Sequence, residues 1–414
     1  MNKVIISNGF SRFPLSYLAE ELWRRGRTEA LITGLYPYQW LIDCLMATSL
    51  ANHAGVARFI DRKVSLPEGV VYTMSAAEIL HFIPYFHETL DLFAMRRYCI
   101  SAAQVVRAAT SNARIYQYRA GFGGASVSVA KSRGMIALCD HSIAHPDLVD
   151  YLAENGGTFP GPGTVVCPSR FWQFIRMDFK HADHFIVNSE FVKQTMLERG
   201  HPSKNIHVVY MGVDDKFLAA LDRCEPRRFF SADRPLRFLF AGTFSRRKGA
   251  EILVKAIDEL NGVPGWELCV AGPIDPEMKT VYDRLVANPR VRDLGLLSRD
   301  ALADAMRRAD VFIFPSFAEG SARVVFEAMA AGCYPVVTRN SGSIVGLEAQ
   351  GDIVAAGNVP DLVTTMIELT KNPQMIRNIS LRNEYVVKNR YRQDQYCDAV
   401  VKLHDKILKY TPIH

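Results

Sequence analysis

The stretch DVFIFPSFAEGSARVVFEAMAAGCYPVVTR, residues 310–339, decides the fold of this chain. It opens with an apolar, β-rich run at 311–314 and continues through a Pro-Ser break into a short polar loop. A helix-like segment then ends at Gly332, and a second β-rich run follows at 334–338. This order predicts a strand–helix–strand unit of a parallel sheet.

Two carboxylates lie in this unit, Glu319 in the loop after the first strand and Glu327 one to two turns into the helix. In open α/β sheets, ligands bind outside the carboxyl ends of the strands, where helix N-termini offer unpaired N–H groups to an anion. The loop Glu319-Gly320-Ser321-Ala322 is therefore a candidate phosphate-and-hydroxyl site. Spacing alone would also fit two solvated glutamates around an amphipathic helix.

The complete block adds a more specific signal. Glu-Gly in the loop, seven residues between the two glutamates, Glu-Ala-Met-Ala-Ala-Gly and then Pro-Val-Val-Thr resemble the signature of the retaining, metal-independent glycosyltransferases of GT-B fold (family four type, glycosyl transferases group 1). The resemblance implies an α/β protein with two Rossmann-like, doubly wound parallel-sheet domains that face each other across a cleft. It also implies a C-terminal helix that crosses back to the first domain.

The length agrees with two domains, because 414 residues exceed one hydrophobic core of ordinary size. We expect an N-terminal, acceptor-binding domain at 1–214 and a nucleotide-sugar-binding domain at 236–390. The polar, proline-containing stretch 215–235 reads as the linker. Residues 396–409 alternate apolar and polar side chains helically, and the resemblance implies that the segment 391–414 is the returning helix.

The composition of the chain limits the cellular compartments and the binding partners that we expect for it. The formal charge of +6 suits an anionic nucleotide donor or an anionic membrane surface, or reflects a few spare lysines and arginines. No nucleic-acid motif is present, so we expect no nucleic-acid partner. Eight scattered cysteines suit reduced thiols, and neither a secretory signal nor a run of about 18 apolar residues is found. We predict a cytoplasmic protein, with peripheral contact at the inner face of the membrane as an option.

A basic turn opens the second domain after the β-rich run 236–241. It reads Gly242-Thr243-Phe244-Ser245-Arg246-Arg247-Lys248-Gly249. Three adjacent cations at a helix N-terminus are unfavourable against the helix dipole unless an anion binds there, so the turn is a candidate diphosphate site. In the family that the chain resembles, a lysine at the position of Lys248 pairs with the pyrophosphate of the donor. The family often has arginine where this chain has Thr243, so either Arg246 or Arg247 would supply a second cation.

Further roles come only from the resemblance. Glu327 would accept hydrogen bonds from the ribose hydroxyls, and Glu319 would hold a sugar hydroxyl near the anomeric carbon. His141, directly after the apolar strand 135–139, would contact the sugar from the first domain. Backbone near Leu297 would meet the base, and the loop at Gly9 would lie beside the donor phosphates. No metal ligand or side-chain nucleophile is predicted.

Several features leave alternatives open. Ser321-Ala322-Arg323 replaces the family's commoner Phe-Gly-Leu, and Arg323 would reach an anionic substrate or point to solvent. Tyr118 and Arg119, before a glycine-rich loop, are candidate acceptor contacts. The apolar stretch 35–50 would form an acceptor wall, a membrane-facing patch or, more commonly, a buried helix.

The sequence thus predicts a retaining glycosyltransferase that moves a sugar from a UDP- or GDP-sugar to a saccharide or lipid-linked saccharide, in polysaccharide or glycolipid biosynthesis. The nucleotide sugar is a co-substrate, and no cofactor is expected. The alternatives are a nucleotide-sugar epimerase of the same fold and a non-catalytic nucleotide-sugar-binding protein.

Overall fold

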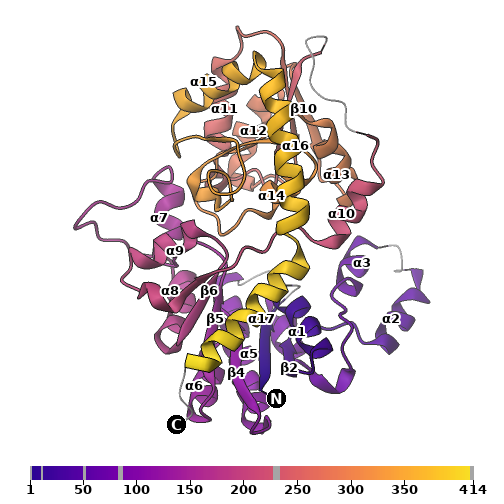
Figure 1. The fold of residues 1–414 in the computed structure, drawn as a ribbon, viewed down its shortest axis with the longest axis vertical. Helices are drawn as coiled ribbons and strands as arrows, with labels where there is room; N and C mark the ends of the chain where they lie inside the picture. The colour runs from indigo at the N-terminus through magenta and orange to yellow at the C-terminus, as the bar shows by residue number, and fades with distance from the viewer. Residues whose placement is uncertain (1, 11–12, 50–52, 83–86, 227–233, 411–414) are drawn as a thin grey trace.

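Two parallel sheets organise the computed structural model, which describes residues 2–10, 13–49, 53–82, 87–226 and 234–410 (Figure 1). The first sheet has the strand order β3-β2-β1-β4-β5-β6-β7, and the second has the order β10-β9-β8-β11-β12-β13. The strands of the first sheet are β1 Lys3–Gly9, β2 Thr28–Thr33, β3 Val71–Thr73, β4 Ala113–Arg119, β5 Ile136–His141, β6 His184–Val187 and β7 Ile206–Val208. Those of the second are β8 Leu236–Ala241, β9 Trp266–Ala271, β10 Val291–Gly295, β11 Val311–Phe314, β12 Tyr334–Val337 and β13 Asp352–Ile353.

Helices cover both faces of each sheet. In the first half they are α1 Leu15–Arg24, α2 Gln39–Met46, α3 Ala54–Ile60, α4 Ser75–His81, α5 His87–Ala108, α6 Gly124–Ser132, α7 Val149–Glu154, α8 Arg170–Met177 and α9 Glu190–Leu197. In the second half they are α10 Asp215–Asp222, α11 Ala250–Glu259, α12 Lys279–Val286, α13 Arg299–Arg308, α14 Arg323–Ala330, α15 Val359–Thr370, α16 Pro373–Arg390 and α17 Gln393–Tyr410. Short 3₁₀ turns include η3 Asp178–His181, η5 Arg246–Lys248, η6 Pro276–Met278 and η7 Arg339–Ser341.

The alternation of side chains along β1 explains why this sheet needs two helical layers. Val4 and Ile6 pack in one core cluster with α1 and α17, whereas Ile5 packs in another with α5 and α6. Successive residues of a strand point to opposite faces, so an apolar run without alternation must be buried on both. The predicted GT-B architecture is confirmed, including the C-terminal helix α17 that crosses back onto the first domain (Figure 1).

The chain passes between the domains twice, at adjacent places. The amide of Val213 donates to the carbonyl of Tyr391 (2.9 Å), and the amide of Gln393 donates to the carbonyl of Val213 (3.1 Å). Gly212 has φ +64°, and a Cβ there would lie 2.1 Å from the Tyr391 oxygen. Glycine is therefore required at this crossing, both for its conformation and for the close approach.

The predicted linker 215–235 is wrong over its first part. Residues 215–222 form α10, whose Phe217 and Leu221 are buried in the core of the second domain. Their helical spacing gives α10 an apolar face, which outweighs its polar composition. Residues 227–233 of that stretch, and 411–414 of the predicted last segment, lie outside the described residues.

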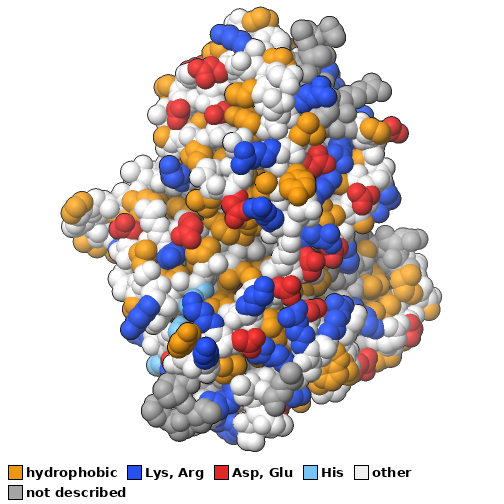
Figure 2. All heavy atoms as spheres, viewed as in Figure 1, with side chains coloured by type: hydrophobic (Ala, Val, Ile, Leu, Met, Phe, Trp, Pro, Cys, Tyr) orange, Lys and Arg blue, Asp and Glu red, His pale blue; other side chains and the backbone are white. Residues whose placement is uncertain are grey.

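Helix α2 contradicts the buried-helix interpretation of the stretch 35–50. None of its residues is buried, and Trp40 is 62% exposed. Figure 2 shows hydrophobic side chains gathered over the projection that α2 and α3 form. Within the described ranges, no helix is both long and apolar enough to cross a membrane. All eight cysteines are free thiols.

Candidate functional site

The site forms where the turn after β8 meets the loop after β11. The Arg247 carbonyl accepts hydrogen bonds from the Phe317 amide (2.8 Å) and the Ser316 hydroxyl (3.1 Å). Because β8 and β11 are neighbours in a parallel sheet, their carboxyl ends lie at one edge. The basic turn and the Glu319 loop, adjacent only in space, therefore make one site.

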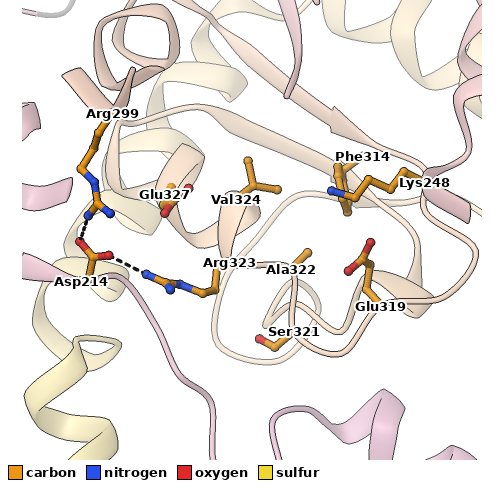
Figure 3. Close-up of a pocket in the computed structure, with 10 residues that line it drawn as sticks. All are labelled: Asp214, Lys248, Arg299, Phe314, Glu319, Ser321, Ala322, Arg323, Val324 and Glu327. Carbon is orange, nitrogen blue, oxygen red and sulfur yellow. Dashed lines mark hydrogen bonds and ion pairs between the residues drawn. The ribbon is translucent and has the colours of Figure 1, made fainter. Parts of the chain in front are cut away.

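A cavity of about 350 Å³ opens between these two loops and α14. It is lined by Asp214, Lys248, Arg299, Phe314, Glu319, Ser321, Ala322, Arg323, Val324 and Glu327. Figure 3 shows Lys248, Phe314 and Glu319 at one end and Asp214 with Arg299 at the other. The volume lies in the range of small-molecule sites.

Lys248 reaches the pocket through a space that Gly242 leaves open. A Cβ on Gly242 would lie 2.7 Å from the lysine Nζ, which lies 5.5 Å from the centre of the Phe314 ring. Burial lowers the pKa of Lys248, although Glu319 partly opposes this. The ammonium group is thus poorly solvated, and an anion in the pocket would stabilise its charge.

The other two cations of the basic turn already have carboxylate partners. The Nη1 atom of Arg247 lies 2.6 Å from Oε1 of Glu319, and Arg246 lies 3.5 Å from Glu251. Arg247 also donates to the Ala318 carbonyl (2.6 Å). Arg247 therefore positions the Glu319 loop.

Two polar groups in the pocket have no hydrogen-bond partner among the described residues. One is the buried hydroxyl of Ser321, and the other is the carboxylate of Glu327. Burial raises the pKa of Glu327, while Arg323 acts in the opposite direction. A buried hydroxyl is normally paired, and the partly exposed Glu327 carboxylate lies in the same pocket, so the two groups together indicate a ligand that supplies donors and acceptors.

The backbone of the loop meets the prediction only in part. The amides of Glu319 and Ala322 donate to the carbonyls of Asn340 and Ser341, each at 3.0 Å. The predicted use of the Ala322 amide for phosphate is therefore wrong, because η7 already occupies it. The amides of Gly320 and Ser321 find no acceptor in the described part of the chain.

Asp214 and Arg299 were not predicted as site residues. Asp214 accepts from Arg299 (2.5 Å) and Arg323 (2.7 Å), and it caps α10 by accepting from the Phe217 amide (2.7 Å). Burial alone would raise its pKa, but Arg323, the capping amide and Arg299 together lower it. Arg299 could have been found by the reasoning applied to the basic turn, since it is a cation at the start of a helix.

The Glu319 loop is held between the two domains. The Ser189 hydroxyl donates to the Gly320 carbonyl, and the Asn340 side chain donates to the Gly157 carbonyl (2.7 Å). A Cβ on Gly320 would lie 1.8 Å from the Ser142 carbonyl oxygen. The two domains are therefore in direct contact here.

His141 lies at the end of β5, but its ring is not part of the pocket. The Nε2 atom lies 3.1 Å from the Ala144 carbonyl, and the ring packs edge-on against Phe179. Burial lowers the pKa of His141 to about 4, so the ring is neutral at pH 7. In this arrangement its backbone neighbour Ser142 meets Gly320, and the imidazole faces the core.

The two predicted acceptor contacts, Tyr118 and Arg119, differ in how deeply they are buried. Tyr118 is fully buried, and its hydroxyl donates to the Asp178 carbonyl (3.0 Å), so it belongs to the core rather than to an acceptor surface. Arg119 is partly buried and lies 4.5 Å from the centre of the Phe13 ring, beside β1.

Six predicted donor contacts lie outside the pocket lining: Gly9, Gly242, Thr243, Arg247, Leu297 and Gly320. Gly9 has φ +77°, and a Cβ there would lie 2.6 Å from the Phe122 ring, so protein already fills the space it leaves. Leu297 packs against the core of the second domain, and Thr243 is partly buried.

Comparisons with known proteins agree with this geometry. Residues 235–372 match the sequence model of the family Glycosyl transferases group 1, and residues 158–217 match Glycosyltransferase Family 4. D-inositol 3-phosphate glycosyltransferase of Mycolicibacterium smegmatis is 29% identical over 211 residues, 48% of this chain and 48% of that protein. MMP alpha-(1->4)-mannosyltransferase of Mycolicibacterium hassiacum is 25% identical over 225 residues, 51% of each chain. The chain spans about half the length of the curated relatives it matches.

Solved structures share the whole architecture. Sucrose-phosphate synthase from Thermosynechococcus elongatus superposes with a TM-score of 0.66 at 16% identity, covering 99% of this chain and 100% of that one. Anabaena HepE in complex with UDP and glucose has a TM-score of 0.60 at 14% identity, covering 98% and 100%. At these identities the likeness shows the fold. The chain therefore has the GT-B fold and carries a domain of the family Glycosyl transferases group 1 at residues 235–372.

Proposed function

We propose that this protein is a retaining glycosyltransferase that moves a sugar from a UDP- or GDP-sugar to a saccharide or lipid-linked saccharide. One observation carries the proposal: a single pocket combines the cation Lys248 with the Glu327 carboxylate and the Ser321 hydroxyl, and none of the three has a hydrogen-bond or ion-pair partner among the described residues. A nucleoside diphosphate supplies what each of them lacks, an anion for the first and hydroxyl donors and phosphate acceptors for the others.

The order of groups in the pocket gives the donor a direction. The diphosphate lies at the Lys248 end, near the amides of Gly320 and Ser321, which have no acceptor in the described ranges, and the ribose lies at Glu327. The nucleoside then extends toward Arg299 and Asp214, which Figure 3 shows at the other end of the pocket, and the sugar lies beside Glu319. Lys248 and the amides stabilise the charge that develops on the leaving diphosphate, and this role requires no metal ion.

The leaving phosphate oxygen takes the acceptor proton on the face from which it departs, so no side chain serves as nucleophile. Arg247 holds Glu319 in position for a sugar hydroxyl. Each charge contact removed would cost on the order of 2–4 kcal/mol of barrier.

The names of similar proteins support a nucleotide-sugar donor and a saccharide acceptor. Relatives are named as acting on inositol 3-phosphate and as a mannosyltransferase, and fold neighbours were solved with UDP and glucose or with UDP-glucose. We place the protein in polysaccharide or glycolipid biosynthesis in the cytoplasm, with peripheral contact at the inner face of the membrane. The exposed apolar face of α2 supports that contact.

A thermal-shift panel of UDP, GDP, ADP and their sugars tests the donor site. We expect at least one nucleotide to raise the melting temperature of the natural protein and not that of Glu327→Ala. A panel without any shift would refute the site. The matching sugar donor, incubated with saccharide acceptors, should give a glycoside; a free sugar isomer without glycoside would instead indicate an epimerase.

His141 needs a test of its own, because a contact with the donor sugar would require the turn 142–145 to open. In His141→Ala we expect nucleotide binding to persist while transfer is lost. Unchanged turnover would remove His141 from the mechanism.

A further inference from the structure

A second cavity, of about 460 Å³, lies in the first domain between α5, α6 and α8. Its floor is made by Cys99 and Val127, both buried, and its walls by Ile100, Phe174 and Met177. No role in the proposed transfer reaction falls on these residues. The cavity is large enough for a small-molecule ligand and is mostly apolar, as such sites usually are.

The protein holds this space open by a rigid arrangement at one end. Asp178 accepts hydrogen bonds from the amides of Gly121 (2.7 Å), Gly123 (2.9 Å) and Gly124 (2.7 Å). Gly124 has φ +43°, and a Cβ there would lie 2.9 Å from Cys99 Cβ, so the start of α6 is pressed against α5. Asp178 is thereby satisfied inside the protein, and its charge does not face the cavity mouth unpaired.

The walls leave large apolar side chains open to water. Ile100 is 50% exposed and Met177 is 58% exposed. Such exposure beside an unfilled apolar cavity is unfavourable, and an apolar ligand would reverse it.

The rim is cationic. Arg96 lies 5.7 Å from the centre of the Phe174 ring, and Lys180 lines the same opening. Neither has a carboxylate partner in the ranges that the structure describes. An apolar interior below two unpaired cations is complementary to a hydrocarbon chain that ends in an anionic group.

We propose that this cavity binds the hydrocarbon chain of one anionic lipid, with its phosphate group at Arg96 and Lys180. The inference rests on the proposed function only in taking that lipid as the anchor of the acceptor saccharide, since the cavity belongs to the domain assigned to the acceptor. The binding itself involves neither the donor nor the pocket at Lys248.

Titration calorimetry with monomeric alkyl phosphates of increasing chain length, on the full chain without nucleotide, tests the proposal. Each added methylene should raise the affinity about fourfold until the cavity is filled, after which the affinity should level off. Ala125→Trp, on the exposed rim of the cavity, should lower the affinity by more than about tenfold, which corresponds to the loss of two methylenes of contact. The matched control Ala57→Trp, on an exposed position of α3, should bind as the natural protein does.

The variant Arg96→Gln distinguishes the contribution of the phosphate head group to the affinity from that of the hydrocarbon chain. It should weaken alkyl phosphates several-fold and leave alkyl alcohols of equal length unchanged. Affinity that does not depend on chain length, or equal binding by Ala125→Trp and Ala57→Trp, would overturn the proposal. Binding to phosphatidylglycerol vesicles without binding of monomeric alkyl phosphates would also overturn it and indicate a surface that contacts the bilayer. A protein that binds a nucleoside diphosphate but no alkyl phosphate refutes this inference and leaves the proposed function standing.

Discussion

Arg247 and Glu319 form an ion pair, with 2.6 Å between Nη1 and Oε1, although 72 residues separate them along the chain. The pair joins the basic turn to the loop after β11. Because Arg246 also has a carboxylate partner, Lys248 is the cation of this fully described turn that remains for a ligand. The two arginines that the sequence left open as the second diphosphate cation are thus both paired with carboxylates in this structure.

Replacement of Lys248 should lower catalytic efficiency without lowering the stability of the fold. Lys248→Met should lower kcat/KM by roughly 30- to 1,000-fold, because a preorganised charge on the leaving diphosphate is lost. The melting temperature without ligand should not fall, since burial already disfavours the charged lysine. Lys279→Met, which removes a lysine from the exposed pair with Asp283, is the control and should keep full activity. Normal turnover in Lys248→Met would contradict the assigned role.

Glu327→Gln should stabilise the protein while weakening nucleotide binding. Burial raises the pKa of Glu327 above its ordinary 4.5, so the folded state binds the proton more tightly than the unfolded state does. The contribution of Glu327 to stability is therefore full below pH 4.5 and is lost as the pH rises through the folded pKa. The gain in melting temperature of Glu327→Gln should thus be largest near pH 8 and vanish near pH 4.5.

The same variant should bind the nucleoside diphosphate about 10- to 150-fold more weakly, the value of hydrogen bonds to a charged acceptor. Glu277→Gln, at an exposed position in η6, provides the control for both measurements. A melting-temperature gain that does not change with pH would show that burial of the charge is not the cause.

Gly320→Ala should interfere with the contact between the domains. Its Cβ would lie 1.8 Å from the Ser142 carbonyl oxygen, yet the position has no left-handed backbone conformation that alanine would strain. We expect nucleotide affinity to stay within a few-fold, turnover to fall by about 100-fold, and the radius of gyration in X-ray scattering to increase. Gly69→Ala, where a Cβ would meet no atom, is the matched control. Equal turnover in both variants would refute the need for this contact.

Docking of α17 should depend on His404 remaining neutral. Its Nε2 lies 2.8 Å from the Gln117 side-chain oxygen in β4, and burial lowers its pKa from 6.5 to about 3. The unfolded state therefore binds the proton first, so the contribution to stability is present above pH 6.5 and is lost as the pH falls toward 3.

In His404→Gln, the fall of unfolding free energy between pH 6.5 and pH 3 should be shallower by up to about 1.4 kcal/mol per pH unit. Urea titrations over this range measure it. The exposed His53→Gln serves as the reference, and an unchanged slope in His404→Gln would show that α17 does not depend on this histidine.

Features of this protein that depend on residues close together in the chain could be predicted from its sequence. The order of strands and helices and the basic turn that contains Lys248 followed from apolar periodicity and from charges that conflict with a helix dipole. These signals lie within a few residues, and the confirmed GT-B architecture rests on them together with the resemblance. The role of Glu327, which lies inside α14, followed only from the resemblance. The helix α10 was misread as a linker because its apolar face is short and lies among polar residues.

The sequence by itself thus determined the two-sheet architecture and the basic turn that contains Lys248, since each depends on short-range pattern. Only the tertiary structure decided which polar groups are already used: Arg247 by Glu319, the Ala322 amide by Ser341, and the imidazole of His141 by the core. The physical reason is that the pairing of a polar group depends on partners brought to it by the fold from distant parts of the chain. Asp214 lies next to the crossing between the domains and accepts hydrogen bonds from Arg299 and Arg323. Only the tertiary structure shows that it belongs to the site.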